Sequence, residues 1–568
     1  LRRADVLSQL AHARTQAGEF AEAHEGLRAA AQLLADGPHA RVLADIRRRM
    51  ADTYIAEGKP AEAVAILQPL VGTLDGDALG QGLAQLTLAR AHLAREHLDP
   101  AAGAAAAALT ALASVGARDF QADAERLLGE VALAQGRHED AFSHARRSLT
   151  YVDDIARGLS DDSMAKARAQ RARTFDVGLS AGWQASRPSW CVEMLEHWRA
   201  RALLDGLGGS MRLSGRGLPP KLRDRESAAQ ADLVGAHRRL WRERRTGKLA
   251  AVRESTKLVH EAQASLEEAR RDVQRASKQL AALKAPAPLN HAEVSSRLLA
   301  GEALAYLTWH ASDVVAITVS AKTTEQTRLC SAEEARKAIA AFDEARNDSA
   351  DAGAHERLQR LRLLLTGSLR VPDGTHTLFL CPEGALNHVP WPALLPALDV
   401  ACIPSGTVLT ALRSQRSTAA SDVLALGNPS YGVRAATSVP MHFRGRALTA
   451  LEGSEAEVRA VARGKQDRKL IGEGATEAAL REALSRPRPW RALLLSCHGL
   501  IERDHPGLSA LALTADATDD GFLTVHEVLE TRIAADLVVA SACDSGRGQT
   551  VRSEGVVGFA RAFMVAGA

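Results

Sequence analysis

The sequence is poor in aromatic residues and has no long apolar run, and both absences reduce the number of fold classes that are possible. Aromatic side chains make up only 4% of its 568 residues, so the core must rest on Ala, Leu and Val, as in closely packed small helices. No run reaches the roughly 18 apolar residues of a membrane span, and the basic, polar start at Leu1 is unlike a secretory signal. A net charge of +3 gives no reason to expect nucleic acid as a partner. We therefore expect a folded protein whose partners include neither a membrane nor a nucleic acid.

Cysteine is also scarce and is not arranged for metal binding. None of the six cysteines forms a C-x-x-C pair, and six in so long a chain do not make a disulfide framework. The sequence lacks G-x-S-x-G, P-loop and H-E-x-x-H motifs, so serine hydrolase, nucleotide-binding and zinc-protease interpretations have no support. We predict no metal and no cofactor, and free cysteines favour a reducing, cytoplasmic location.

The N-terminal third of the chain repeats. Similar turns occur at Gly18–Ala23, Gly58–Ala63 and Gly136–Ala141, and His97 to Ala101 fills the position between the last two, which gives a period of about 40 residues. Each turn lies between stretches with apolar residues at three- and four-residue steps, which is typical of helix-turn-helix repeats. The pattern resembles tetratricopeptide repeats over residues 1–204. Such arrays present concave surfaces, so we expect a regulatory protein partner there, with a plain spacer as the alternative.

A linker and a helical hairpin are predicted to follow the repeats. Glycine and proline interrupt the helical pattern at 205–221. Within 222–288, apolar residues from Val252 to Leu283 recur at seven-, three- and four-residue steps, which predicts a heptad seam. The arginines clustered before Thr246 are interpreted as the solvated face of a helix. Nucleic-acid contact is the weaker alternative, because few aromatic side chains accompany them.

The C-terminal half, residues 289–568, has a different residue pattern from the N-terminal repeats. Short β-branched or aliphatic runs, such as 314–319 and 536–540, alternate there with helical stretches. This alternation predicts a three-layer α/β domain with a mostly parallel sheet. The predicted fold class of the whole chain is therefore α+α/β: a helical repeat solenoid, a helical hairpin and a C-terminal α/β domain.

Two of the predicted strands end in residues suited to nucleophilic catalysis. His498 follows the run at 492–496, and Cys543 follows the run at 536–540. Catalytic groups of such sheets gather beyond the carboxyl ends of strands, so the pair would share a crevice if the two strands are neighbours. A nearby imidazolium lowers the thiol pKa; the thiolate attacks a peptide carbonyl, and the histidine protonates the leaving amine. The backbone amides of Gly499 and Cys543 would stabilise the oxyanion.

An ordered set of segments in this half carries the strongest signal: Pro382–Leu394, Gly427–Pro429, Leu451–Val458, Gly472–Leu480, Ser496–Gly499, Ser509–Leu511, Asp520–Thr524, Ser541–Gly546 and Glu554–Phe563. Caspases likewise carry their catalytic His about 50 residues before the Cys. In this order the segments resemble the CHAT family, a caspase-like domain that is often found behind tetratricopeptide repeats and is related to separase. The resemblance spans about residues 300–568 and implies a caspase-like cysteine endopeptidase for protein or peptide substrates, with His498 and Cys543 as its dyad.

Several alternatives stay open. In the CHAT family a further strand and helix follow the position of Ala568, so we expect the domain to be truncated there and its substrate cleft to be incomplete. A chain that kept the fold without activity would be a catalytically silent scaffold for protein partners. Asp544 either lines a substrate pocket that prefers a basic residue before the cut or hydrogen-bonds its own loop. Cys497 is expected in the core rather than in the site, because neighbouring strand residues face opposite sides. Four connector residues would make the cleft acidic: Glu502, Asp504, Asp519 and Asp520.

Overall fold

A computed structural model describes most of residues 1–156, 172–199 and 288–567, and scattered helical positions between 221 and 269. Outside the described residues lie the rest of 157–287, a few single residues, and the stretches 36–38, 348–352, 416–419, 432–441, 444–445, 503–505, 543–548 and 552–554. The chain divides into two compact units, Leu1–Arg157 with Gln170–Leu195 and Gly158–Ala169 with Glu196–Ala568. The four predicted domains are finer than this division and stay predictions. The predicted linker at 205–221 falls almost wholly outside the described residues.

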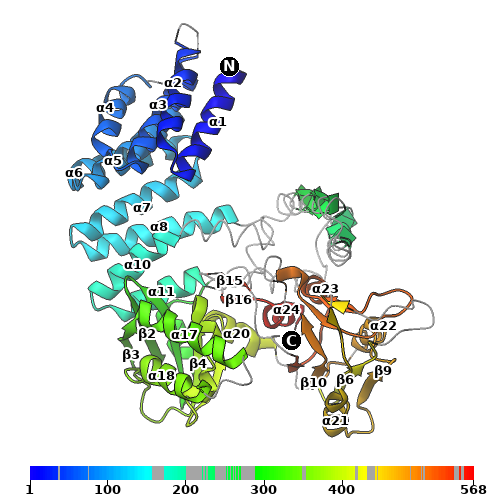
Figure 1. Ribbon diagram of the computed structural model, residues 1–568. Coiled ribbons are helices and arrows are strands. Elements are labelled where there is room, and N and C mark those ends of the chain that lie inside the picture. The colour runs from blue at the N-terminus through cyan, green and yellow to red at the C-terminus, as the bar shows by residue number, and fades with distance from the viewer. Residues whose placement is uncertain are drawn as a thin grey trace. The chain divides into compact units, whose positions relative to one another are not determined.

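The first unit is built from successive helices, most of which are paired across short turns (Figure 1); this confirms the predicted helical repeats. Alanines fill the interfaces between the helices, because a methyl side chain lets two backbones approach closely; α6 alone buries four of them. The helices are α1 (Arg2–Ala17), α2 (Phe20–Gln32), α3 (Ala40–Ala56), α4 (Pro60–Val71), α5 (Ala78–Ala94), α6 (Leu98–Ser114), α7 (Arg118–Ala134), α8 (His138–Ala156), α10 (Ala172–Gln184) and α11 (Pro188–Trp198).

Several of the turns between these helices share one backbone geometry. Gly18, Gly58 and Gly136 have φ values of 81°, 81° and 73°, the left-handed conformation that ends a helix and favours glycine. Glu96, in the turn before His97 that has no glycine, adopts the same conformation with φ of 58°. The turn is therefore required by the pairing of the helices, and glycine is the residue that makes it with least strain.

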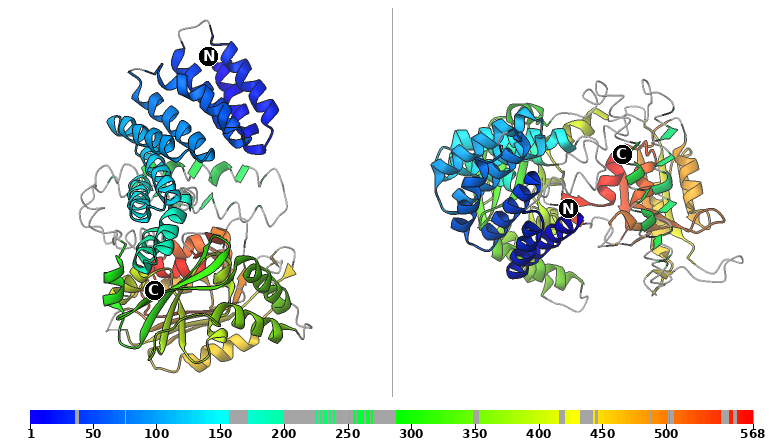
Figure 2. Two further views of the ribbon diagram at one scale, coloured as in Figure 1. Left: turned by 90° about the vertical axis from the view of Figure 1, so that its left-hand side faces the viewer. Right: turned by 90° about the horizontal axis from the view of Figure 1, so that it is seen from above.

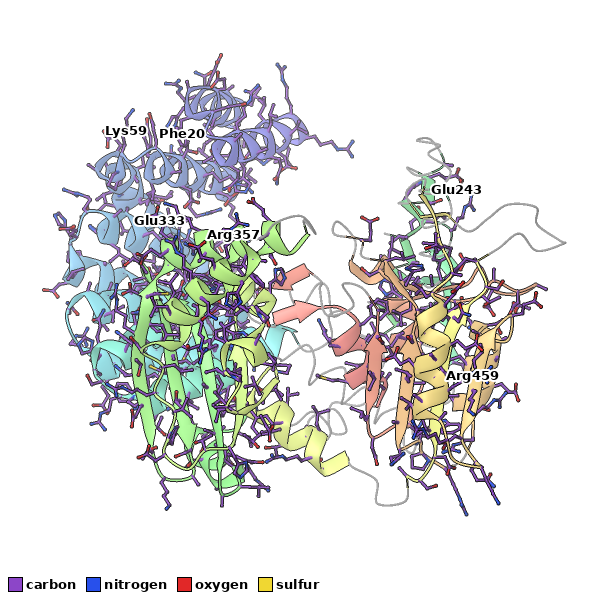
Figure 3. The ribbon with its side chains drawn as sticks, turned by 60° about the horizontal axis from the view of Figure 1, so that its bottom comes forward. Phe20, Lys59, Glu243, Glu333, Arg357 and Arg459 are labelled. Atoms are coloured by element: carbon purple, nitrogen blue, oxygen red, sulfur yellow. The ribbon has the colours of Figure 1, made fainter. Side chains whose placement is uncertain are left out.

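The second unit contains a mixed five-stranded sheet with the order β3-β2-β1-β4-β5 (Figure 2). Its first three strands are antiparallel neighbours, whereas β4 and β5 run parallel to β1. Helices α17 and α18, on which Figure 3 labels Glu333 and Arg357, pack their apolar side chains on one face of the sheet. The elements are α16 (His291–Arg297), β1 (Glu302–His310), β2 (Asp313–Ser320), β3 (Thr324–Ser331), α17 (Ala332–Asn347), α18 (Ala354–Thr366), β4 (Thr377–Pro382), η1 (Gly384–His388), α19 (Trp391–Leu394), β5 (Asp399–Cys402) and α20 (Gly406–Gln415).

A second sheet is entirely parallel and has the order β14-β10-β6-β9. Helix α21 packs on one face, around Val458, and helices α22, α23 and α24 pack on the other, around Leu480, Val528 and Phe563. The three-layer α/β arrangement is as predicted, but the strands form separate mixed and parallel sheets instead of one mostly parallel sheet. The elements are β6 (Val423–Pro429), β7 (His442–Phe443), β8 (Arg446–Ala447), α21 (Glu452–Val461), β9 (Arg468–Gly472), α22 (Glu477–Leu484), β10 (Ala492–Ser496), α23 (Val525–Glu530), β14 (Val538–Ser541), β15 (Gln549–Val551), β16 (Gly555–Val557) and α24 (Phe559–Ala566).

A small antiparallel sheet lies between β10 and α23 in the chain. It consists of β11 (His498–Leu500), β12 (Ala510–Ala512) and β13 (Phe522–Thr524), with the short helix η2 (Pro506–Leu508) before β12. Apolar residues of the predicted hairpin, among them Leu233 and Leu266, share one buried cluster with Leu500 and Phe522 of this sheet. The described positions between 221 and 269 are helical, and their apolar side covers the sheet that begins at His498.

The end of helix α11 is part of the core of the second unit. The carboxylate of Glu196 accepts hydrogen bonds from the Gly406 amide at 2.7 Å, from the Thr407 amide at 2.8 Å and from the Tyr306 hydroxyl. Arg199 donates to main-chain oxygens at the carboxyl ends of β1 and β4, for example to Cys381 O at 2.5 Å. Both side chains are buried, so the sheet depends on two residues that the helical pattern assigns to the repeats.

Candidate functional site

Strands β10 and β14 are neighbours and run parallel, which meets the condition set by the sequence for a shared site. Their register pairs Ser496 with Ser541, the last residue of each strand. His498 and Cys543 each follow two residues later in the sequence. Because parallel strands end at the same edge of a sheet, the two segments leave from adjacent points. Cys543 and Asp544 themselves lie outside the described residues, so their geometry stays a prediction.

His498 is held by its ring as well as by its main chain. Its Nε2 lies 2.8 Å from the carbonyl oxygen of Thr449. A carbonyl can only accept, so Nε2 carries the hydrogen of the neutral ring, and Nδ1 is left as the basic nitrogen. Among the described residues, none forms a hydrogen bond with Nδ1. The ring can therefore take a proton at Nδ1 while Nε2–H stays bonded to Thr449.

The residues on either side of His498 have separate environments. Cys497 is 1% exposed, and burial raises its pKa to about 12, so it stays a neutral thiol in the core, as the alternation of strand faces predicted. Ser496 donates to the carboxylate of Glu457 on α21 at 2.6 Å, which fixes the end of β10. Gly499, the predicted oxyanion donor, is half-buried in β11 opposite Leu511 of β12.

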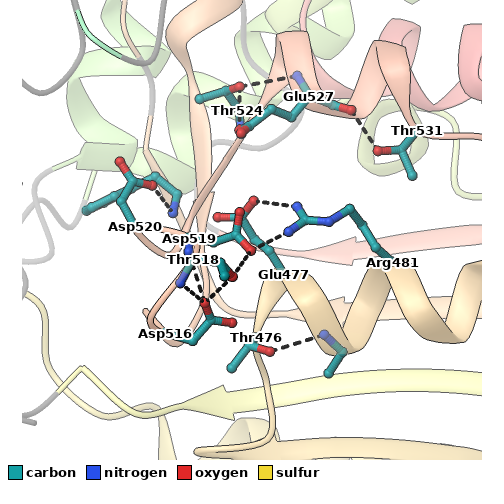
Figure 4. A network of polar contacts seen from close by, with 12 residues as sticks. Thr476, Glu477, Arg481, Asp516, Thr518, Asp519, Asp520, Thr524, Glu527 and Thr531 are labelled. Carbon is teal, nitrogen blue, oxygen red and sulfur yellow. Dashed lines mark hydrogen bonds and ion pairs between the residues drawn. The ribbon is translucent and has the colours of Figure 1, made fainter. Parts of the chain in front are cut away.

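A buried carboxylate network supports the loop between β12 and β13 (Figure 4). Arg481 donates to Glu477 at 3.1 Å and also to Asp519. Burial, followed by the charges of Glu527, Asp519 and Asp520, raises the pKa of Glu477 to about 8, although Arg481 opposes the shift. One carboxylate oxygen of Glu477 is buried with no partner among the described residues. Sequence reasoning missed this network, because Glu477 and Arg481 look like an ordinary ion pair along one helix.

Two of the four acidic connector residues are largely buried, and the predicted acidic cleft stays a prediction. Asp519 and Glu502 are each 9% exposed, which leaves little of either carboxylate to line a cleft. Asp519 is turned toward Arg481 instead. Asp504 lies outside the described residues. The guanidinium of Arg481 is shared by Asp519 and Glu477, which explains why these two carboxylates can be buried together.

Comparisons with known proteins identify the C-terminal region. A family model described as the CHAT domain matches residues 355–568, and this family is related to caspase-like proteases. In that part of the chain which the structure describes, no helix combines the length and the apolar character needed to cross a membrane. No curated protein sequence matches the chain.

Several solved structures of repeat proteins are similar at low identity. A kinesin light chain of Podospora anserina with nearly identical TPR-like repeats is 17% identical; the match covers 34% of this chain and 92% of that one, with a TM-score of 0.28. BtubC from P. vanneervenii is 16% identical, with 48% and 93% covered and a TM-score of 0.26. The Rap conjugation gene regulator of plasmid pLS20, in complex with the Phr* peptide, is 13% identical, with 47% and 74% covered and a TM-score of 0.24. At these scores the likeness says nothing about ligands. The chain therefore combines an N-terminal region of helical repeats with a C-terminal region whose residues 355–568 match the CHAT domain model.

Proposed function

We propose that the CHAT domain is a cysteine endopeptidase that cleaves protein or peptide substrates with Cys543 as nucleophile and His498 as acid and base. The observation that carries the proposal is the parallel pairing of β10 with β14 in a register that aligns Ser496 with Ser541. Both candidate groups follow these residues at the same distance along the chain. Chance placement of a lone Cys and a lone His would not require their strands to be neighbours.

The tautomer of His498 suits this chemistry. Because Nε2–H is bonded to Thr449 O, Nδ1 is the atom that takes the thiol proton of Cys543. The thiolate then forms a bond to the scissile carbonyl carbon, and the carbonyl electrons move to oxygen. Amides of Gly499 and Cys543 would bind that oxyanion. The C–N bond breaks as the Nδ1 proton passes to the leaving amine, and water attacks the thioester to release the second product.

Substrate preference and regulation extend the same proposal. If Asp544 faces the bound peptide, its carboxylate favours a basic residue before the cut, because an ion pair stabilises that side chain in the pocket. The repeats recruit a substrate or a regulatory protein, as helical arrays commonly do. Residues of the hairpin cover the small sheet that begins at His498, so we propose that a partner acting on the repeats or the hairpin sets the activity.

The deciding experiment is cleavage of a diverse peptide library, which reports both activity and the residue before the cut. We expect cleavage that is lost in Cys543→Ala and retained in Cys497→Ala, the matched control for losing a thiol from the same region. A basic residue before the cut would support the pocket at Asp544. The same assay is run on a form extended beyond Ala568. If neither form cleaves any peptide, with or without cell extract as a source of activator, the result would favour the catalytically silent scaffold.

The regulatory part has its own test. Deleting residues up to Pro288 from the extended form should change the cleavage rate if the repeats or the hairpin control it. An unchanged rate would refute regulation and leave the protease proposal intact.

A further inference from the structure

Tyr431 lies directly against His498, although it follows a different strand. It comes two residues after the end of β6 and is only 4% exposed. Its ring centre is 5.2 Å from that of His498, with the two planes inclined at 45°. The tyrosine ring thus packs beside the imidazole and restricts its rotation about the side-chain bonds.

The hydroxyl of Tyr431 bridges the two strands on which His498 depends. It accepts the main-chain N–H of His498 at 3.4 Å and donates to the carbonyl oxygen of Ala512 at 3.0 Å. His498 and Ala512 are opposite each other in the β11–β12 pair. One hydroxyl therefore satisfies a donor on β11 and an acceptor on β12, at the point where the short ladder begins.

The surroundings of Tyr431 keep its hydroxyl protonated and its ring in one position. Burial raises the pKa of Tyr431 well above its ordinary value, so the hydroxyl keeps its hydrogen and can donate to Ala512. Its ring belongs to the same buried cluster as Leu500, Phe522 and Leu266 of the hairpin. The cluster leaves the ring little room to move, and a rigid support is what a positioning side chain needs.

We propose that Tyr431 is a positioning residue for His498: its hydroxyl fixes the main chain and its ring fixes the plane of the imidazole, so that the ring keeps one orientation when Nδ1 exchanges a proton. This inference rests on the proposed function, because it assumes that His498 acts on Cys543. Thr449 O and Tyr431 then have separate roles in positioning His498. Thr449 sets the tautomer through Nε2, and Tyr431 sets the orientation.

The test measures the reactivity of Cys543 toward iodoacetamide as a function of pH in the full chain. Trypsin releases Cys543 in the peptide 533–547, which holds no other cysteine, so mass spectrometry reports its alkylation alone. The variants are Tyr431→Phe, which removes only the hydroxyl, and His498→Ala. Tyr306→Phe is the matched control, since it also removes a buried and hydrogen-bonded tyrosine hydroxyl. Tyr306 lies in β1 of the five-stranded sheet and donates to Glu196 at the end of α11.

We expect Cys543 to react as a thiolate at pH values well below the usual thiol pKa of about 8.5 in the wild type and in Tyr306→Phe. His498→Ala should lose this reactivity at low pH. Tyr431→Phe should raise the pH at which alkylation of Cys543 is half-maximal, and it should slow alkylation at pH 6 about fivefold. This is the ratio expected for one lost hydrogen bond between neutral groups. An unchanged midpoint in a folded Tyr431→Phe protein, with His498→Ala still defective, would overturn the role of Tyr431 alone. Equal profiles for wild type and His498→Ala would instead overturn the dyad.

A measurement on the wild type covers the case in which Tyr431→Phe does not fold. Hydrogen exchange at the His498 amide should be slow, because that N–H donates to a buried hydroxyl. Exchange as fast as in an unprotected amide would show that the bridge does not exist in solution.

Discussion

Replacing Glu477 with Gln should stabilise the second unit at alkaline pH. Glu477 is 1% exposed and shares Arg481 with Asp519, so the network holds more carboxylates than cations. Desolvation and the neighbouring charge of Glu527 raise the pKa of Glu477 to about 8, which keeps the side chain protonated at neutral pH. A glutamine has nearly the same shape and carries no charge at any pH, so it imitates the protonated form.

The sign and size of the effect follow from proton binding. The folded pKa of Glu477 lies above its unfolded value of 4.5. Between these values the folded state binds more protons than the unfolded state, so stability falls as pH rises toward 8. At about 1.4 kcal/mol for each unit of pKa, the full displacement corresponds to at most about 5 kcal/mol, and relaxation around Arg481 should reduce the loss to roughly half of that.

The assay is thermal unfolding of the full chain at pH 5 and pH 8, with the second unit followed by hydrogen exchange in α22 and β12. Glu477→Gln should match the wild type at pH 5 and unfold several degrees higher at pH 8. Glu482→Gln on the same helix is the control, since its side chain is 69% exposed and pairs at the surface with Arg468. Equal destabilisation by Glu477→Gln at both pH values would refute the reasoning, because it would mean that Glu477 is ionised and that its pair with Arg481 is stabilising.

Three further substitutions test other parts of the structure. Leu266→Asp places a charge in the cluster between the hairpin and the small sheet, so exchange should accelerate in β11 and β12; unchanged protection there would argue against the contact. Gly521→Ala should lower stability by about 2 kcal/mol in a melting experiment, because φ is +80° and the added methyl would lie 2.7 Å from Ala515 N; Gly453→Ala, whose methyl meets open space, should be close to neutral. Glu196→Ala removes the acceptor of amides at the start of α20 and should cost about 3 kcal/mol in the second unit, measured by urea unfolding; a loss confined to the first unit would contradict the assignment.

The features that the sequence predicted well are those set by local pattern. The glycine turns near residues 18, 58 and 136 have the left-handed geometry that their position at helix ends requires. The runs at 492–496 and 536–540 correspond to the strands β10 and β14. Apolar periodicity and turn residues act over a few neighbours, so they can be recognised without knowing the rest of the fold.

Features that depend on partners distant in sequence could not be predicted in the same way. Nothing near Tyr431 indicates that its hydroxyl reaches Ala512, 81 positions later. The contact exists because β6 and β10 are adjacent in the parallel sheet. The antiparallel pairing of β1, β2 and β3 could likewise not be predicted, because continuous aliphatic runs occur in buried parallel strands and in buried antiparallel strands.

The burial of Glu196 and Arg199 bears on how regulation can be tested. Both lie at the end of α11, where periodicity alone assigns them to the repeats, yet their partners are in β1, β4 and α20. Deleting residues up to Pro288 therefore removes the hairpin together with two buried groups of the five-stranded sheet. A rate lost on deletion would follow from damage to that sheet as readily as from a lost activator, because unpaired buried amides and carbonyls destabilise the fold. Only an unchanged rate is therefore decisive in the deletion experiment. Leu266→Asp leaves Glu196 and Arg199 in place, but a rate lost in that variant is no positive case for regulation, because Leu266 shares its buried cluster with Tyr431 and with the sheet that begins at His498.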